Sequence, residues 1–182
     1  MFKNRSTHYG LVSVTLHWLV ALTVFGLFAL GFWMVDLTYY SSWYRTAPHW
    51  HKSVGIILLI AMLFRVGWRF FTVSPLPVAT HRKWEQIASK AAHFLLYAGI
   101  FAIIFTGYLI STADGRPIAV FDWFEIPSAG ELFARQADIA GDLHRYLAYG
   151  VIAIAVLHAV AALKHHFIDK DATFRRMLGR KN

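Results

Sequence analysis

Histidine is the residue type whose number and placement in this chain point to chemistry. The sequence has 182 residues, with ten histidines and no cysteine. Without cysteine there are no disulfides, thiolate zinc sites, cysteine-ligated iron–sulfur clusters or thioether-linked haem. Five histidines lie in or at the ends of long apolar segments: His17, His51, His93, His144 and His158. An ionisable residue inside such a segment is costly and is a functional hypothesis by default.

The spacing of these histidines separates them into two levels. His144 and His158 are fourteen residues apart, which in a helix is nearly four turns and about 21 Å of rise, so they share one face at two depths. If consecutive segments run antiparallel, His51 lies at the depth of His144, and His17 lies at the depth of His158 with His93 as a spare. A haem iron with two axial imidazoles needs one histidine from each of two facing helices. The pattern therefore predicts two b-type haems, held by these two pairs.

Other metals and other histidines fit the pattern less well. Zinc or copper binding is the main alternative, but it would need ligands clustered at one level. Gly31 and Gly107 follow His17 and His93 by fourteen residues, at the outer depth. They either make room for a porphyrin or simply allow close helix packing. The remaining histidines lie near segment ends and are interpreted as interfacial or hydrogen-bonded residues: His8, His49, His81, His165 and His166.

Four apolar segments must position the histidines. The chain is 57% hydrophobic and 15% charged, whereas a soluble domain is about 45–50% apolar and about 25% charged. Each segment is close to the roughly 20 residues that span a bilayer. We predict an all-α integral membrane protein, a four-helix bundle forming one domain over residues 1–182. The predicted spans cover about residues 11–35, 51–71, 88–111 and 142–163.

The distribution of charge predicts the orientation of the chain. Thirteen of the eighteen Lys and Arg residues fall on the side that holds both termini, and five fall on the other side. Because basic residues collect on the cytoplasmic side, both termini are predicted to be cytoplasmic. The same bias explains the net charge of +8 without nucleic-acid binding. The polar connection over residues 112–141 is expected to hold a short helix at 128–140, and a charged surface helix is expected after His166.

Three cations adjoin the predicted haem sites. Arg65 is the one charge within a span, and it either extends to the cytoplasmic surface or pairs with a propionate of the inner haem. Lys52 and Arg145 follow the outer histidines directly. They would attract an anion locally, or pair with propionates, or extend into the interface. The outer segments carry five basic and seven acidic residues, so any such attraction acts within a mildly acidic surround.

Short motifs along the chain resemble those of the prokaryotic cytochrome b561 family. The resemblance covers nearly the whole chain. It implies a multi-pass cytochrome of the bacterial inner membrane with two b haems, in which His93 is unligated. The implied ligands are His17, His51, His144 and His158. The motifs that carry the resemblance are Tyr9-Gly10, Leu16-His17-Trp18-Leu19, His51-Lys52-Ser53-Val54-Gly55, His93-Phe94-Leu95-Leu96-Tyr97, Gly107-Tyr108, Leu143-His144, Leu157-His158-Ala159, Lys164-His165-His166-Phe167 and Asp169-Lys170-Asp171.

Iron with two histidine ligands has no open coordination position, so it suits electron transfer. Some family members resemble superoxide oxidases, which take electrons from superoxide and reduce ubiquinone. The resemblance therefore implies an oxidoreductase that exchanges electrons with the quinone pool, and no residue is identified as catalytic. Two alternatives remain. One is a membrane-anchor subunit that passes electrons for a soluble dehydrogenase or hydrogenase as redox partner, and the other is a non-redox metal or proton transporter.

Overall fold

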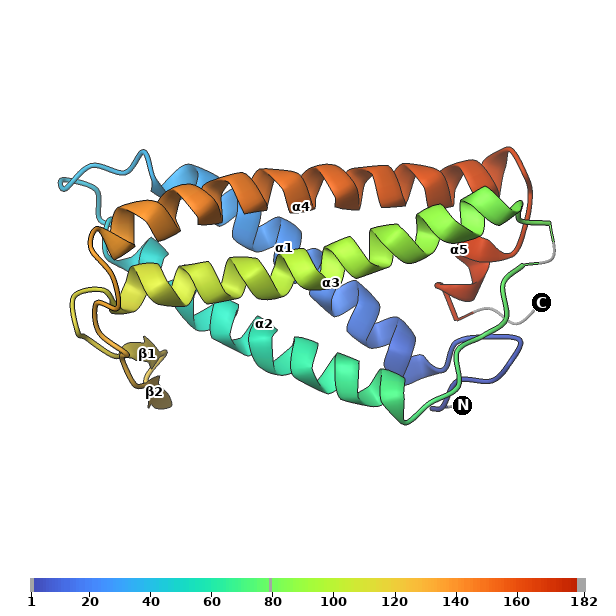
Figure 1. Ribbon diagram of the computed structural model, residues 1–182, viewed down its shortest axis with the longest axis horizontal. Helices are drawn as coiled ribbons and strands as arrows, with labels where there is room; N and C mark the ends of the chain where they lie inside the picture. Colours follow the sequence, from blue (N-terminus) through green and yellow to red (C-terminus); the bar gives the residue numbers. More distant parts are fainter. Residues whose placement is uncertain (1, 79, 180–182) are drawn as a thin grey trace. The chain divides into compact units, whose positions relative to one another are not determined.

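The chain is mostly helical in the computed structural model, which describes residues 2–78 and 80–179. Four helices are long and apolar enough to cross a membrane (Figure 1). This confirms the prediction of an all-α fold with four spans. The elements in chain order are α1 (Leu11–Met34), α2 (Thr46–Phe70), α3 (Lys83–Thr112), β1 (Ile118–Val120), β2 (Phe124–Ile126), α4 (Gln136–Phe167) and α5 (Thr173–Arg176).

Helices α2, α3 and α4 extend beyond the predicted spans. The sequence pattern marks only the apolar part of each helix, whereas the backbone hydrogen bonds continue through the polar residues at its ends. In α2 the helix starts at Thr46, five residues before the predicted start at 51. Pro48 is tolerated there because the first turn of a helix needs no backbone N–H donor from that residue. Within the predicted connection over 112–141, helix begins only at Gln136 and is continuous with α4.

Large apolar side chains point outward along all four helices. Leu22, Phe64, Phe105 and Leu157 are each more than half exposed. A soluble protein rarely exposes apolar side chains on such a scale, because that surface is stabilised only when it leaves water. The four spans satisfy their own backbone hydrogen bonds, which is what the hydrocarbon region of a bilayer requires. This is the fold of a multi-pass membrane protein.

The chain divides into two compact units. The first, here called the terminal unit, comprises residues 1–21, 61–97 and 153–182. The Asn4 carboxamide ties its N-terminal segment to α1, because its oxygen accepts hydrogen bonds from the Gly10 amide at 2.8 Å and the Ser13 hydroxyl at 2.7 Å. The C-terminal part of this unit is also tied to α1, because Trp18 Nε1 donates to the Met177 carbonyl at 2.8 Å. The charged helix predicted after His166 is shorter than expected, since α5 is a single turn.

The second unit, here called the hairpin unit, comprises residues 22–60 and 98–152. It contains a β-hairpin that the sequence analysis did not predict, in which β1 and β2 pair antiparallel with Ile118 opposite Ile126. Ser53 of α2 is fully buried beneath this hairpin. Its hydroxyl donates to the Ala119 carbonyl at 3.4 Å and accepts from the Phe121 amide at 2.9 Å. The hairpin is therefore fixed directly to the helical turn that carries His51.

Gln136 closes the loop that leads from the hairpin into α4. Its side chain is fully buried. The amide nitrogen donates to the carbonyls of Leu109 at 2.9 Å and Gly130 at 3.2 Å. The amide oxygen accepts from the Leu132 backbone N–H at 2.7 Å. One side chain thus joins the end of α3, the loop and the start of α4.

Replacing Gln136 with Leu should destabilise the protein. Leu has about the same side-chain volume as Gln but forms no hydrogen bonds, so three backbone groups lose their partner. Each group that stays unpaired costs about 1–3 kcal/mol. We expect a lower midpoint in a thermal unfolding experiment on the purified protein in detergent. An unchanged midpoint would mean that the loop is held in place without this side chain.

Candidate functional site

The hairpin unit brings His51 of α2 and His144 of α4 together. Their imidazole rings lie 6.1 Å apart between centroids, with an angle of 67° between the ring planes. Both side chains are half-buried. This is one of the two pairs that the sequence predicts.

Each ring in this pair has one nitrogen whose surroundings bear on ligand binding. Nδ1 of His144 lies 2.9 Å from the Ile103 carbonyl and 3.2 Å from the Thr106 hydroxyl. A carbonyl only accepts, so Nδ1 carries the proton and Nε2 keeps its lone pair. Metal-binding histidines are commonly oriented by such a bond. Nδ1 of His51, in contrast, is buried and has no hydrogen-bond partner among residues 2–78 and 80–179.

Two glycines lie against the rings of this pair. A Cβ atom at Gly31 would be 3.1 Å from Cε1 of His51, and one at Gly107 would be 3.2 Å from Cε1 of His144. Carbon atoms in contact prefer about 3.5–4.0 Å. Each imidazole therefore occupies space that is open only because its neighbour has no side chain. The structure thus shows that these glycines accommodate the two imidazole rings.

The terminal unit holds the second predicted pair. The rings of His17 in α1 and His158 in α4 lie 6.2 Å apart between centroids, with an angle of 63° between their planes. This geometry is almost the same as that of the first pair. His93 of α3 also lies in this cluster, with its ring centroid 5.1 Å from that of His158.

Arg65 of α2 binds side chains within the terminal unit. Its guanidinium donates to the Tyr97 hydroxyl at 2.8 Å and to Nδ1 of His17 at 3.1 Å. A third, longer bond of 3.5 Å reaches the Leu16 carbonyl. Arg65 is therefore held beside the histidine cluster in this structure. Sequence reasoning did not identify Tyr97 as its partner, because two residues 32 positions apart meet only through the tertiary structure.

The separation between the rings tests whether the pairs fit haem. An imidazole–metal bond is about 2.0 Å, and the nitrogen lies about 1.1 Å from the ring centroid, so two axial imidazoles place their centroids about 6.2 Å apart. The pairs His51–His144 and His17–His158 have centroid separations of 6.1 and 6.2 Å. The 5.1 Å separation between His93 and His158 is shorter than this value. The residues present therefore fit the group, and they fit it as the two predicted pairs.

A cavity of about 240 Å³ lies beside the His51 turn in the hairpin unit. Lys52 and His49 line it together with Asp114 and Arg116. The Arg116 guanidinium donates to Asp114 with its Nε at 2.7 Å and holds the pKa of that carboxyl below its usual value, so the two charges offset each other. Lys52 has no hydrogen-bond or ion-pair partner in the described part of the chain. Arg145 is exposed and is not one of the cavity-lining residues.

Two groupings important to these sites were not predicted from the sequence. Thr106 orients His144 through its hydroxyl. The position of Thr106 in the sequence gives no sign of this role. The hairpin and its anchor Ser53 place a polar cavity beside the His51 turn, although the chain around residues 118–126 reads only as a connection. Both arise from contacts between residues at least 38 positions apart.

Comparison with known proteins gives a consistent result. Residues 8–180 match the family described as "Prokaryotic cytochrome b561". The chain is 49% identical over 181 residues to "Cytochrome b561 homolog 2" of Escherichia coli K12, covering 100% of this chain and 96% of that protein. It is 27% identical over 177 residues to "Probable superoxide oxidase CybB" of Yersinia pestis, covering 95% of this chain and 97% of that protein. It is also 25% identical to "Cytochrome b561 homolog 1" of E. coli K12, covering 95% and 98% of the two chains.

Proposed function

The chain belongs to the prokaryotic cytochrome b561 family, and from this premise we propose that it is a di-haem b protein that oxidises superoxide and reduces quinone. The coarser function follows from the family itself: membrane electron transfer by a haem-binding protein of the bacterial inner membrane. The proposal adds the number of haems, their ligands, the electron donor and the acceptor. Two superoxide anions would give two molecules of dioxygen, and one quinone would take up the two electrons with two protons.

The observation that carries the proposal is the equal geometry of the two histidine pairs. Ring separations of 6.1 and 6.2 Å recur in the two units, with interplanar angles of 67° and 63°. We propose that His51 and His144 hold one haem and that His17 and His158 hold the other. When bound, haem supplies one-electron redox chemistry. With two imidazoles bound to each iron, no coordination position would stay open, which would favour electron transfer over ligand binding at iron.

The proton on each ligating ring must be on the nitrogen away from the iron. For His144 the Ile103 carbonyl already holds it on Nδ1. For His17 the nitrogen Nδ1 accepts from Arg65, so Nδ1 cannot carry a proton while this bond lasts. We therefore expect Arg65 to release His17 when the site is loaded. Its guanidinium, still bound to Tyr97, would then be available to a propionate, as the sequence analysis suggested.

The donor site would lie at the cavity beside the His51 turn. Superoxide is a small anion, and Lys52 gives this cavity a positive charge that no neighbouring carboxylate offsets. Asp114 is already paired with Arg116. A cation in a recess raises the local concentration of an anion and its rate of encounter. The relative named as a probable superoxide oxidase supports the same donor.

We propose further that the terminal unit faces the cytoplasm. Thirteen of the eighteen Lys and Arg residues belong to the terminal unit and five to the hairpin unit. Basic residues are retained on the cytoplasmic side during insertion. On this orientation both termini are cytoplasmic and superoxide meets the protein from outside the cell membrane.

Replacing Lys52 with Gln should slow the reduction of the haems by superoxide about tenfold at low salt. An enzymatic source of superoxide and stopped-flow absorbance of the haem bands measure this rate, and added ubiquinone should then reoxidise the protein. The wild-type rate should fall as salt is raised, because exposed charges are screened beyond about 8 Å at physiological ionic strength. The variant should keep its full haem content.

Arg135→Gln is the matched control, since Arg135 is an exposed cation of the hairpin unit that pairs with Asp138. Its rate should stay at the wild-type value, and that of Arg145→Gln should fall less than that of Lys52→Gln. If superoxide reduced the wild-type haems no faster than the dismutation background, the donor would be wrong. That result would favour the anchor-subunit alternative, which co-purification of a dehydrogenase would test.

A further inference from the structure

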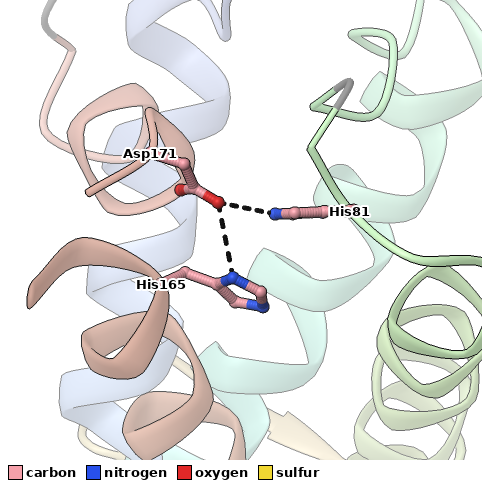
Figure 2. Close-up of side chains that lie close together, drawn as sticks. All are labelled: His81, His165 and Asp171. Atoms are coloured by element: carbon pink, nitrogen blue, oxygen red, sulfur yellow. Dashed lines mark hydrogen bonds and ion pairs between the residues drawn. The ribbon is translucent and has the colours of Figure 1, made fainter. Parts of the chain in front are cut away.

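Three polar side chains from separate segments meet in the terminal unit, outside the haem sites. His81 comes from the connection before α3, His165 from the last turn of α4, and Asp171 from the loop before α5 (Figure 2). Oδ2 of Asp171 lies 2.9 Å from Nε2 of His81 and 3.3 Å from Nδ1 of His165. The three potential ligand atoms all lie within 4.8 Å of one another. Both imidazoles thus direct a nitrogen toward the same carboxylate oxygen.

The cluster is buried and one of its atoms lacks a partner. The side chain of Asp171 is 3% exposed, and that of His165 is 12% exposed. Nδ1 of His165 forms no well-aligned hydrogen bond with any residue in the described ranges. This is so even though an oxygen of Asp169 lies only 2.7 Å away. The neighbouring carboxylates therefore leave this buried nitrogen without a hydrogen bond, and it remains available to a ligand.

The side chains around the cluster prepare Asp171 for this role. Its other oxygen, Oδ1, accepts from the Thr173 backbone N–H at 2.8 Å, which fixes Oδ2 toward the imidazoles. The nearby cation Lys164 is bound by Glu85 at 3.0 Å and Asp169 at 2.7 Å, so its charge is offset.

We propose that His81, His165 and Asp171 form a binding site for a divalent transition-metal ion, with Zn²⁺ as the best match. Two imidazoles and a carboxylate are ligands that zinc prefers, at about 2.0–2.2 Å from the ion. Ligand atoms on a tetrahedron of that size are about 3.3–3.5 Å apart. The separation between Asp171 and His165 is 3.3 Å, and that between Asp171 and His81 is 2.9 Å, so these two side chains would move apart by about 0.5 Å to bind the ion. A water molecule takes the fourth position. The ion would link the α2–α3 connection to the last turn of α4 and to the loop before α5.

The two imidazole rings of the cluster lie close together. Their centroids are 4.4 Å apart and their planes are inclined by 36°. Both rings can therefore bind one cation together with Asp171. The competing explanation is an ion pair between one protonated histidine and Asp171, and the experiment separates the two.

Calorimetric titration of ZnCl₂ into the full-length, haem-loaded protein tests the site, after removal of any affinity tag and treatment with EDTA. We expect one zinc ion per chain. His165→Gln and Asp171→Asn should each weaken binding at least about 100-fold. His166→Gln is the matched control, because this neighbouring histidine is outside the three-ligand cluster, and it should bind as the wild type does. X-ray absorption at the zinc edge should show two imidazole nitrogens and a carboxylate oxygen.

Several results would overturn the proposal. Wild-type protein that binds no zinc, with lower thermal stability in the variants, would show an ion pair alone. Equal zinc binding by the wild type and both variants would place the ion elsewhere, and loss of binding in His166→Gln would do the same. If a variant loses its haem bands, it is not properly folded and its zinc affinity is not informative. The thermal unfolding midpoint of the wild type, measured with and without zinc, then tests the site. Zinc should raise that midpoint and EDTA should reverse the increase, and no change would refute the site.

Discussion

Protein carrying His51→Ala should contain one haem per chain instead of two, and His144→Ala should lose the same haem. The two rings are 6.1 Å apart, the separation expected for two ligands of one iron. Removing either ring would leave the haem with one protein ligand in place of two and would leave a cavity beside the other ring, which costs further stability. A pyridine-haemochrome assay gives the haem count, and the reduced-minus-oxidised spectrum identifies the component that is lost.

The same reasoning predicts a complementary result in the terminal unit. His17→Ala and His158→Ala should both remove the other spectral component and leave the first intact. His93→Ala is the matched control: this ring lies in the same cluster, but its 5.1 Å separation from His158 is too short for two axial ligands. It should keep both haems. If His93→Ala lost a haem and His17→Ala kept both haems, His93 would be the ligand and His17 the unligated residue. If His51→Ala and His17→Ala lost the same spectral component, the pairing would be refuted.

Replacing Gly107 with Val should also cost one haem, although the residue binds nothing itself. Even a Cβ at this position would be 3.2 Å from Cε1 of His144, and Val adds two methyl groups to that Cβ. The imidazole must then rotate away from the direction set by the Ile103 carbonyl and the Thr106 hydroxyl. We expect the component that disappears to be the one lost in His144→Ala, as judged by the difference spectrum.

Gly31→Val should have the same effect through His51, because a Cβ there would be 3.1 Å from that ring. Gly26→Val is the matched control on α1. It makes the same change in helix propensity but points about 140° away around the helix, where an added Cβ meets nothing within 4 Å. Gly26→Val should retain both haems. Full haem content in Gly31→Val and Gly107→Val would show that the histidines can move without loss of the site.

Sequence alone was sufficient for the membrane fold and for the proximity of His51 to His144 and of His17 to His158. The four apolar segments are long enough to span a bilayer, and a helix that crosses it has little freedom in direction. Depth is therefore a function of position along the chain. Once depth is known, fourteen-residue spacing on one helix separates His144 from His158 and assigns each a partner. The family resemblance led to the same residues independently.

Helix ends and loops were less well predicted. The apolar pattern stops where a helix leaves the hydrocarbon region, but the backbone hydrogen bonds of α3 and α4 do not stop there. The β1–β2 hairpin escaped prediction because its strands have only three residues each, too few for an alternating pattern to emerge. Its position depends on Ser53, which is 66 residues before its partner Ala119 in the sequence.

Only the tertiary structure decided what the neighbours of the histidines do. The sequence gives no sign that the rings of His51 and His144 lie against Gly31 and Gly107. Arg65 could have extended to the surface, but its guanidinium binds Tyr97 and His17. His81 and His165 were interpreted as interfacial or hydrogen-bonded residues, and nothing in the order of the chain indicates that they meet Asp171. Periodicity determines the face and depth of a residue within one helix, whereas contacts between helices depend on rotation, crossing and loop path, which no local pattern encodes.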